Sequence, residues 1–127
     1  EMGLSSFPIF NTPQEFGLNM IEEGFDLVST ATNHSMDMGA EGIERQYNFW
    51  KSHDDQILME GTNLSWEERN EISVRECNGI SYAFLSWTFG TNGIRCLKAW
   101  NILSIPIPAM RMRCSNRSGG QMKWRTL

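Results

Sequence analysis

The chain has 127 residues, of which 40% are hydrophobic and 11% aromatic, and its formal net charge is −4. This length suits a single domain with a modest core, and the composition fits a globular protein rather than a disordered one. No apolar run approaches the roughly 20 residues that span a bilayer, and no basic and apolar signal segment follows Glu1. Because the three cysteines are odd in number and lack metal-ligand spacing, they argue against a disulfide framework.

The first predicted helix begins after Thr12 and ends before Gly24. Thr12 is expected to cap this helix, with Glu15 completing the spacing of a capping box. Phe16 and Met20 are one helical turn apart and are expected to belong to its apolar stripe. Gly24 stops the helix, because glycine commonly follows the last helical turn.

A strand, a helix and a second strand are predicted next. Phe25–Ala31 is a short apolar run, which is typical of a buried strand. Ala40–Ser52 has the spacing of an amphipathic helix, and Ile57–Met59 is a candidate short strand. The apolar face of this helix consists of Ile43, Tyr47 and Trp50.

The clearest β signal is a hairpin. Glu71–Cys77 and Ile80–Phe89 flank Asn78 and Gly79, the preferred pair for a two-residue turn. Ser65–Asn70, just before the hairpin, is expected to be a helical turn capped by its serine. The order of these elements predicts the α/β class, with helices packed on the faces of a sheet.

Three tryptophans precede residue 94. Trp50, Trp66 and Trp87 are suited to stacking on a sugar or polymer, but spacing favours core positions for Trp50 and Trp87. Cys77 is expected to be a buried small hydrophobe.

The segment STATNHSMDMG, residues 29–39, places Asn33, His34 and Asp37 just after the first predicted strand. Ligands of open α/β sheets bind beyond the carboxyl ends of strands. An Asn carbonyl oxygen can bind a hard metal ion, and a neighbouring His can donate a proton or contact phosphate. A second interpretation stays open, in which Asn33 takes a left-handed turn, His34 is an exposed loop residue and Asp37 caps the next helix.

A wider match bears on this choice. The runs FPIFNTPQEF, GFDLVSTATNHSMDMGAEGI and NEISVRECNGISYAFLSWTFGTNG, which cover most of residues 1–94, resemble the CapA family of capsule and poly-γ-glutamate synthesis proteins. The resemblance implies a partial metallophosphatase-like α/β/β/α sandwich. It implies that Asn33 is a metal ligand, that His34 is the catalytic proton donor or phosphate contact, and that Asp37 orients the loop. Gly39 matches the family signature, and Asn92 lies in a turn that approaches the site.

The resemblance also implies a larger parent protein. CapA proteins carry earlier strands with Gly-Asp and Asn-x-Glu motifs, and later histidine-bearing loops, that this chain lacks. We therefore expect an inactive piece of a domain whose divalent metal, if the parent binds one, is absent from the piece. The parent is expected on the extracytoplasmic face of the bacterial membrane, held by an N-terminal anchor, with an anionic polymer or the capsule machinery as partner. The alternative function is a metal-dependent phosphoesterase of the calcineurin-like superfamily.

The charge is divided along the chain. All 15 acidic residues lie at or before Glu76, and seven of the 11 basic residues follow Ile94. Such an asymmetry predicts a boundary, with a CapA-like region over residues 1–94 and an irregular, disordered basic tail over residues 95–127. A basic tail is one interpretation of this segment, but it lacks a nucleic-acid-binding motif, so we expect no nucleic-acid partner.

A frameshift is the second interpretation of residues 95–127. Plausible codons from Ile94 onward, regrouped by one base, encode Pro-Val-Pro-Glu-Gly-Met-Glu, which resembles the CapA segment after the Gly-Thr-Asn-Gly turn. An acidic amphipathic helix follows in that reading. We predict that sequencing of the gene will find a base lost near the Ile94 codon. An intact frame supported by independent reads would exclude the frameshift.

Overall fold

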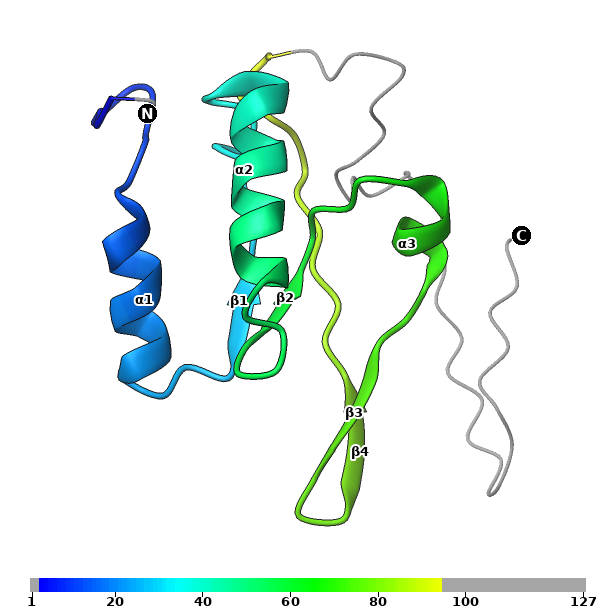
Figure 1. The fold of residues 1–127 in the computed structure, drawn as a ribbon. Helices are drawn as coiled ribbons and strands as arrows, with labels where there is room; N and C mark the ends of the chain where they lie inside the picture. Colours follow the sequence, from blue (N-terminus) through cyan, green and yellow to red (C-terminus); the bar gives the residue numbers. More distant parts are fainter. Residues whose placement is uncertain (1–2, 95–127) are drawn as a thin grey trace.

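The computed structural model describes residues 3–94, which form a small mixed α/β unit (Figure 1). In chain order the elements of this part are α1 (Gln14–Glu22), β1 (Leu27–Ser29), α2 (Gly39–Lys51), β2 (Leu58–Glu60), α3 (Trp66–Asn70), β3 (Val74–Cys77) and β4 (Ile80–Ala83). The strands form two sheets of two strands each, β1 with β2 and β3 with β4. The α/β class predicted from the sequence is therefore confirmed.

β1 and β2 pair in parallel, with Leu27 opposite Leu58 and Ser29 opposite Glu60. Parallel neighbours need a crossover connection, and α2 supplies it while packing against β2. The buried apolar side chains come mainly from α2 and from the chain around the two strands: Ala31, Met36, Ile43, Tyr47, Trp50, Ile57 and Leu58. The carboxyl ends of both strands therefore meet at one edge of the sheet, where the loops after Ser29 and Glu60 begin.

Hydrogen bonds join the segments that meet at this carboxyl edge. The Thr30 amide and hydroxyl both donate to the carbonyl oxygen of Glu60, at 2.9 and 3.1 Å. The Thr62 hydroxyl donates to the Thr30 hydroxyl at 2.7 Å, and the hydroxyl oxygens of Ser29 and Ser86 lie 2.6 Å apart. Thr30, Thr62 and Ser86 are buried, but each has a partner, so their burial carries little desolvation penalty.

Gly61 permits the close approach of the chain at this edge. A Cβ at Gly61 would lie 2.5 Å from the backbone nitrogen of Ala31 and 2.8 Å from the hydroxyl oxygen of Ser86. Its φ of +115° is also one that a side chain disfavours. Only glycine fits this position without displacing the backbone that follows β1.

α1 packs on α2 through a glycine. Gly17 is buried, and a Cβ there would lie 2.5 Å from the ring of Phe49. Phe16, expected on the apolar stripe of this helix, is 57% exposed and so lies outside the buried core. Pro13 occupies the N-cap position without a side-chain hydrogen bond, so the predicted cap by Thr12 is wrong.

The hairpin turn has the predicted geometry. Asn78 and Gly79 have φ values of 52° and 76°, as a two-residue turn of this kind requires. β3 and β4 are shorter than the predicted runs, and the hairpin extends away from the rest of the described chain (Figure 1). Cys77 is exposed, so its predicted burial is wrong: all four residues of β3 are exposed, and within residues 3–94 the main packing of this strand is against β4.

Other packing predictions have mixed outcomes. The Ser65 hydroxyl accepts a hydrogen bond from the Glu68 amide and caps α3, as expected. Trp50 is buried, which confirms its core position, but Trp87 is 46% exposed. The strand predicted at residues 25–31 is shorter and exposed, with Phe25 52% and Leu27 38% accessible.

The predicted basic tail, residues 95–127, lies outside the described residues. Within residues 3–94, no helix is both long and apolar enough to cross a membrane.

Replacement of Gly61 by alanine should destabilise the fold strongly. The new methyl group would overlap the backbone at Ala31, and the alanine would have to keep a disfavoured φ. We therefore expect a loss of about 2–5 kcal/mol in unfolding free energy. Chemical denaturation measures this loss. Gly90→Ala is the matched control, because a Cβ at Gly90 meets no atom within 4 Å. Equal stability of the two variants would contradict the proposed close approach.

Candidate functional site

The loop between β1 and α2 has an internal scaffold of hydrogen bonds. The Ser35 hydroxyl donates to the Thr30 carbonyl oxygen at 2.7 Å and accepts from the Thr32 amide at 2.7 Å. The His34 amide donates to the Thr32 hydroxyl at 3.2 Å. Since Thr30 itself is bonded to β2, the loop that carries Asn33 and His34 is fixed to the carboxyl edge of the parallel pair.

Asp37 contacts both His34 and the segment before α1. One carboxylate oxygen, Oδ2, accepts from the Phe10 amide at 2.8 Å and lies 2.8 Å from Nδ1 of His34. The Asp37 side chain is only 3% exposed, whereas that of His34 is 32% exposed. Asp37 thus connects the loop after β1 with the chain that precedes α1.

The ionisation of Asp37 fixes the roles in this contact. The Phe10 amide holds the pKa of the Asp37 carboxyl below its ordinary value of 3.8, burial acts in the opposite direction, and His34 lowers the pKa further. An ionised carboxylate can only accept hydrogen bonds, so Nδ1 of His34 carries the proton that it shares with Asp37. This arrangement leaves Nε2 of His34 free of the carboxylate.

Asn92 joins the site from 59 residues further along the chain. The side-chain amide nitrogen of Asn33 donates to Oδ1 of Asn92 at 3.1 Å. The amide nitrogen of Asn92 lies 3.4 and 3.5 Å from the two ring nitrogens of His34, which is the limit of a hydrogen bond. Asn92 has a left-handed φ of 51° in a turn closed by a Thr91–Ile94 backbone hydrogen bond.

Gly39 is the first residue of α2 and has a φ of +64°. Its amide donates to the Met36 carbonyl oxygen at 2.9 Å, so the chain turns sharply from the loop into the helix at this point. Gly39 therefore shapes the loop, and its role as a binding residue stays a prediction.

The structure brings together Asn33, His34, Asp37 and Asn92, which the sequence had nominated. The second interpretation of this motif, in which its residues have only structural roles, is wrong in two details. Met38, rather than Asp37, occupies the N-cap position of α2, and Asn33 does not have the left-handed backbone found at Asn92. Phe10 was missed by the sequence interpretation, because its contact is made by a backbone amide, which any residue other than proline could supply.

A metal ion would need more ligands than this site provides. Among residues 3–94, no group of three or more His, Cys, Asp or Glu side chains is arranged to hold one. The Oδ1 atom of Asn33 lies outside its hydrogen bond to Asn92, so it remains a possible single ligand. The described residues therefore fit part of a metal site and do not complete one.

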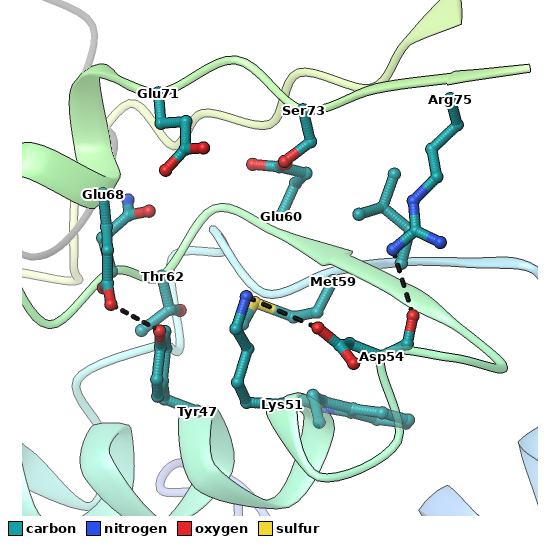
Figure 2. Close-up of a pocket in the computed structure, with 13 residues that line it drawn as sticks. Tyr47, Lys51, Asp54, Met59, Glu60, Thr62, Glu68, Glu71, Ser73 and Arg75 are labelled. Atoms are coloured by element: carbon teal, nitrogen blue, oxygen red, sulfur yellow. Dashed lines mark hydrogen bonds and ion pairs between the residues drawn. The ribbon is translucent and has the colours of Figure 1, made fainter.

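A separate polar cleft of about 190 Å³ lies between α2, β2, α3 and β3 (Figure 2). The Tyr47 hydroxyl donates to Glu68 at 2.7 Å across it. Lys51 lies 3.7 Å from the Asp54 carboxylate, and Arg75 donates to the Asp54 carbonyl oxygen at 3.0 Å. Charges of both signs line the cleft, so its chemistry does not favour one class of ion.

Burial changes two pKa values in the cleft. The pKa of Tyr47 is raised to about 12, mainly by burial and secondly by the hydrogen bond to Glu68. The hydroxyl therefore stays protonated and continues to donate. Burial also raises the pKa of Glu60, against the effect of a hydrogen bond from Ser73. Figure 2 shows Ser73 beside Glu60, with Glu71 directed toward the same space.

Comparison with known proteins identifies the family. The family model for the bacterial capsule synthesis protein PGA_cap matches residues 1–107 of the chain. The chain belongs to this family. The match confirms the resemblance to CapA proteins, and it extends beyond residue 94, where we predicted a boundary. No curated protein and no solved structure matches the chain.

Asp37→Asn should loosen the site of this capsule synthesis family member. The change weakens two charge-assisted hydrogen bonds, so we expect a loss of about 1 kcal/mol in unfolding free energy at neutral pH. Because the pKa of Asp37 is lowered in the folded state, its stabilisation is complete above the unfolded value near 3.8 and disappears as the pH falls through the lower folded value.

The difference between wild type and Asp37→Asn should therefore shrink on acidification, as followed by thermal unfolding at several pH values. Asp26→Asn, at an exposed aspartate before β1, is the control and should match wild type throughout. A difference independent of pH would contradict the role of the Asp37 charge.

Proposed function

We propose that this chain is part of a CapA-like protein of capsule or poly-γ-glutamate synthesis, and that Asn33 and His34 belong to a phosphate-binding site of metallophosphatase type. One observation carries the proposal. The Asn-His pair lies at the carboxyl edge of a parallel strand pair, in contact with Asn92 from a distant turn. This edge is where α/β folds bind ligands.

In this proposal His34 is the catalytic group. Asp37 retains the proton on Nδ1, so the doubly protonated imidazolium would donate from Nε2–H to a phosphate oxygen or to a leaving oxygen. The half-buried position of the imidazole gives a ligand access to it. Asn33 would bind a divalent ion through Oδ1, which would supply charge stabilisation at the phosphate. The further ligands would have to come from outside residues 3–94.

The exposed apolar side chains support the proposal that the chain is a piece of a larger α/β/β/α sandwich. Parallel strands normally occur in sheets covered on both faces, yet β1 has one partner strand among the described residues. Three apolar side chains are 38–57% exposed: Phe16 on α1, Phe25 just before β1 and Leu27 in β1. Additional strands beside β1 would cover such a surface, and we propose that the parent protein supplies them. Residues 1–127 alone would then be inactive.

The family description supports an envelope function. A capsule synthesis protein works where polymer is assembled, so we propose that the parent acts at the extracytoplasmic face of the membrane through an anchor outside this chain. Its partner would be an anionic polymer or the capsule synthesis machinery.

A metal-dependent phosphoesterase is the alternative function, and the His34–Asp37 pair favours it. A histidine oriented by a carboxylate is an arrangement that proton transfer uses.

Complementation of a deletion strain tests the proposal. The intact parent gene should restore the capsule polymer, and its His34→Ala variant should restore less than about a tenth, because general acid chemistry contributes about a hundredfold or more. His53→Ala is the matched control and should restore the polymer fully, since the His53 ring lies at the end of α2 beside Ser52 and the Phe49 carbonyl oxygen. Residues 1–127 alone should restore none. Full restoration by His34→Ala would contradict the proposed site.

Purified parent protein separates the two functions. Hydrolysis of a generic phosphodiester that needs added divalent metal and is lost in His34→Ala would establish the phosphoesterase. Polymer loss without such hydrolysis would favour a role in assembly.

A further inference from the structure

Phe10 contacts the His34–Asp37 pair through two different groups. Its backbone amide donates to Oδ2 of Asp37 at 2.8 Å, the oxygen that also lies 2.8 Å from Nδ1 of His34. Its ring meets the His34 ring edge to face, with 4.6 Å between centroids and an angle of 89° between planes. Phe10 therefore touches both members of the pair, although it lies 27 residues from Asp37 in sequence.

The segment that presents Phe10 is itself fixed. Ser5 and Asn11 exchange backbone hydrogen bonds at 3.2 and 3.1 Å, which closes a loop around Phe10. The Asn11 side chain also donates to the carbonyl oxygen of Gly3 at 2.8 Å. Because the neighbouring residue is held in this way, little further conformational entropy is lost when Phe10 docks on the pair.

The ring contact restricts the orientation of the imidazole. A histidine ring that rotates about its Cβ–Cγ bond exchanges the places of its two nitrogen-bearing edges. A half-turn of His34 would break the Asp37 hydrogen bond, and any tilt of the ring out of its present plane would disturb the edge-to-face contact with Phe10. The side-chain amide of Asn92 makes only long contacts of 3.4–3.5 Å with the ring nitrogens of His34.

We propose that Phe10 is a positioning residue for His34: its ring and its backbone amide hold the imidazole with Nδ1 on Asp37 and Nε2 available to the ligand. The catalytic consequence rests on the proposed function, whereas the orientation of the ring can be measured independently of any activity. Phe10 does not itself touch a reacting atom. It acts through His34 and Asp37.

Nuclear magnetic resonance of the chain with isotope-labelled histidine tests the orientation. The chain has two histidines, so the signals of His34 are identified by their loss in His34→Ala, and His53 serves as an internal reference. In wild type, the neutral His34 ring should be the Nδ1–H form. Phe10→Ala should shift the carbon-bound ring protons of His34, because the ring current of Phe10 is lost, and should add the Nε2–H form. The His53 signals should not move.

Two further variants make the outcome specific. Phe16→Ala removes an exposed phenylalanine of α1 and should leave both histidines unchanged. Phe10→Tyr keeps the aromatic edge at a position that is 43% exposed, and should retain the wild-type His34 signals. His34 signals that are identical in wild type and Phe10→Ala, or that move equally in Phe16→Ala, would overturn the proposal.

Kinetics of the parent protein then test the catalytic consequence. Phe10→Ala should lower kcat for a phosphodiester about tenfold to a hundredfold with little change in KM, since misorientation of a catalytic group affects the reaction more than binding. Phe10→Tyr should restore kcat. A parent without turnover would refute the phosphoesterase function, while the histidine signals would still decide the positioning role. Turnover that is unaffected by Phe10→Ala would refute that role in catalysis.

Discussion

The parallel pairing of β1 with β2 is the constraint on which the described structure depends. It requires the crossover through α2, brings both carboxyl ends to one edge and buries the core beneath that helix. At this edge the backbone of Ala31 lies so close to Gly61 that residue 61 has no room for a side chain. Thr30 bonds to Glu60 there and also carries the hydrogen bond from Ser35, so sheet pairing extends directly into the loop of the Asn-His pair.

A single carboxylate oxygen organises the site on that edge. Oδ2 of Asp37 receives the Phe10 amide and the His34 ring, which joins the chain before α1 to the loop after β1. The oxygen is buried but both of its partners donate to it, so the charge is stabilised and the imidazole has a defined direction.

The distribution of apolar side chains separates two parts of the described chain. Ile43, Tyr47 and Trp50 of α2 are buried as their spacing requires, whereas Phe25 and Leu27 remain accessible near β1. Burial of an amphipathic helix needs only the sheet beneath it, which is present. Burial of a parallel strand needs neighbours on its edge and both faces, and the described residues supply only some of them. The larger sandwich that we propose would cover these accessible side chains.

The sequence alone determined the elements whose signals are local. The spacing of α2, the Ser65 cap of α3 and the Asn78-Gly79 turn depend on residues within a few positions of one another, and all three are as predicted. The Asn-His-x-x-Asp motif nominated His34 and Asp37, because they lie three residues apart on one loop. Tertiary structure alone decided the burial of Gly17, the exposure of Trp87, the tight passage at Gly61 and the contact from Phe10. Each of these depends on which distant segment lies opposite, and a backbone amide or a missing side chain leaves no trace in the residue pattern.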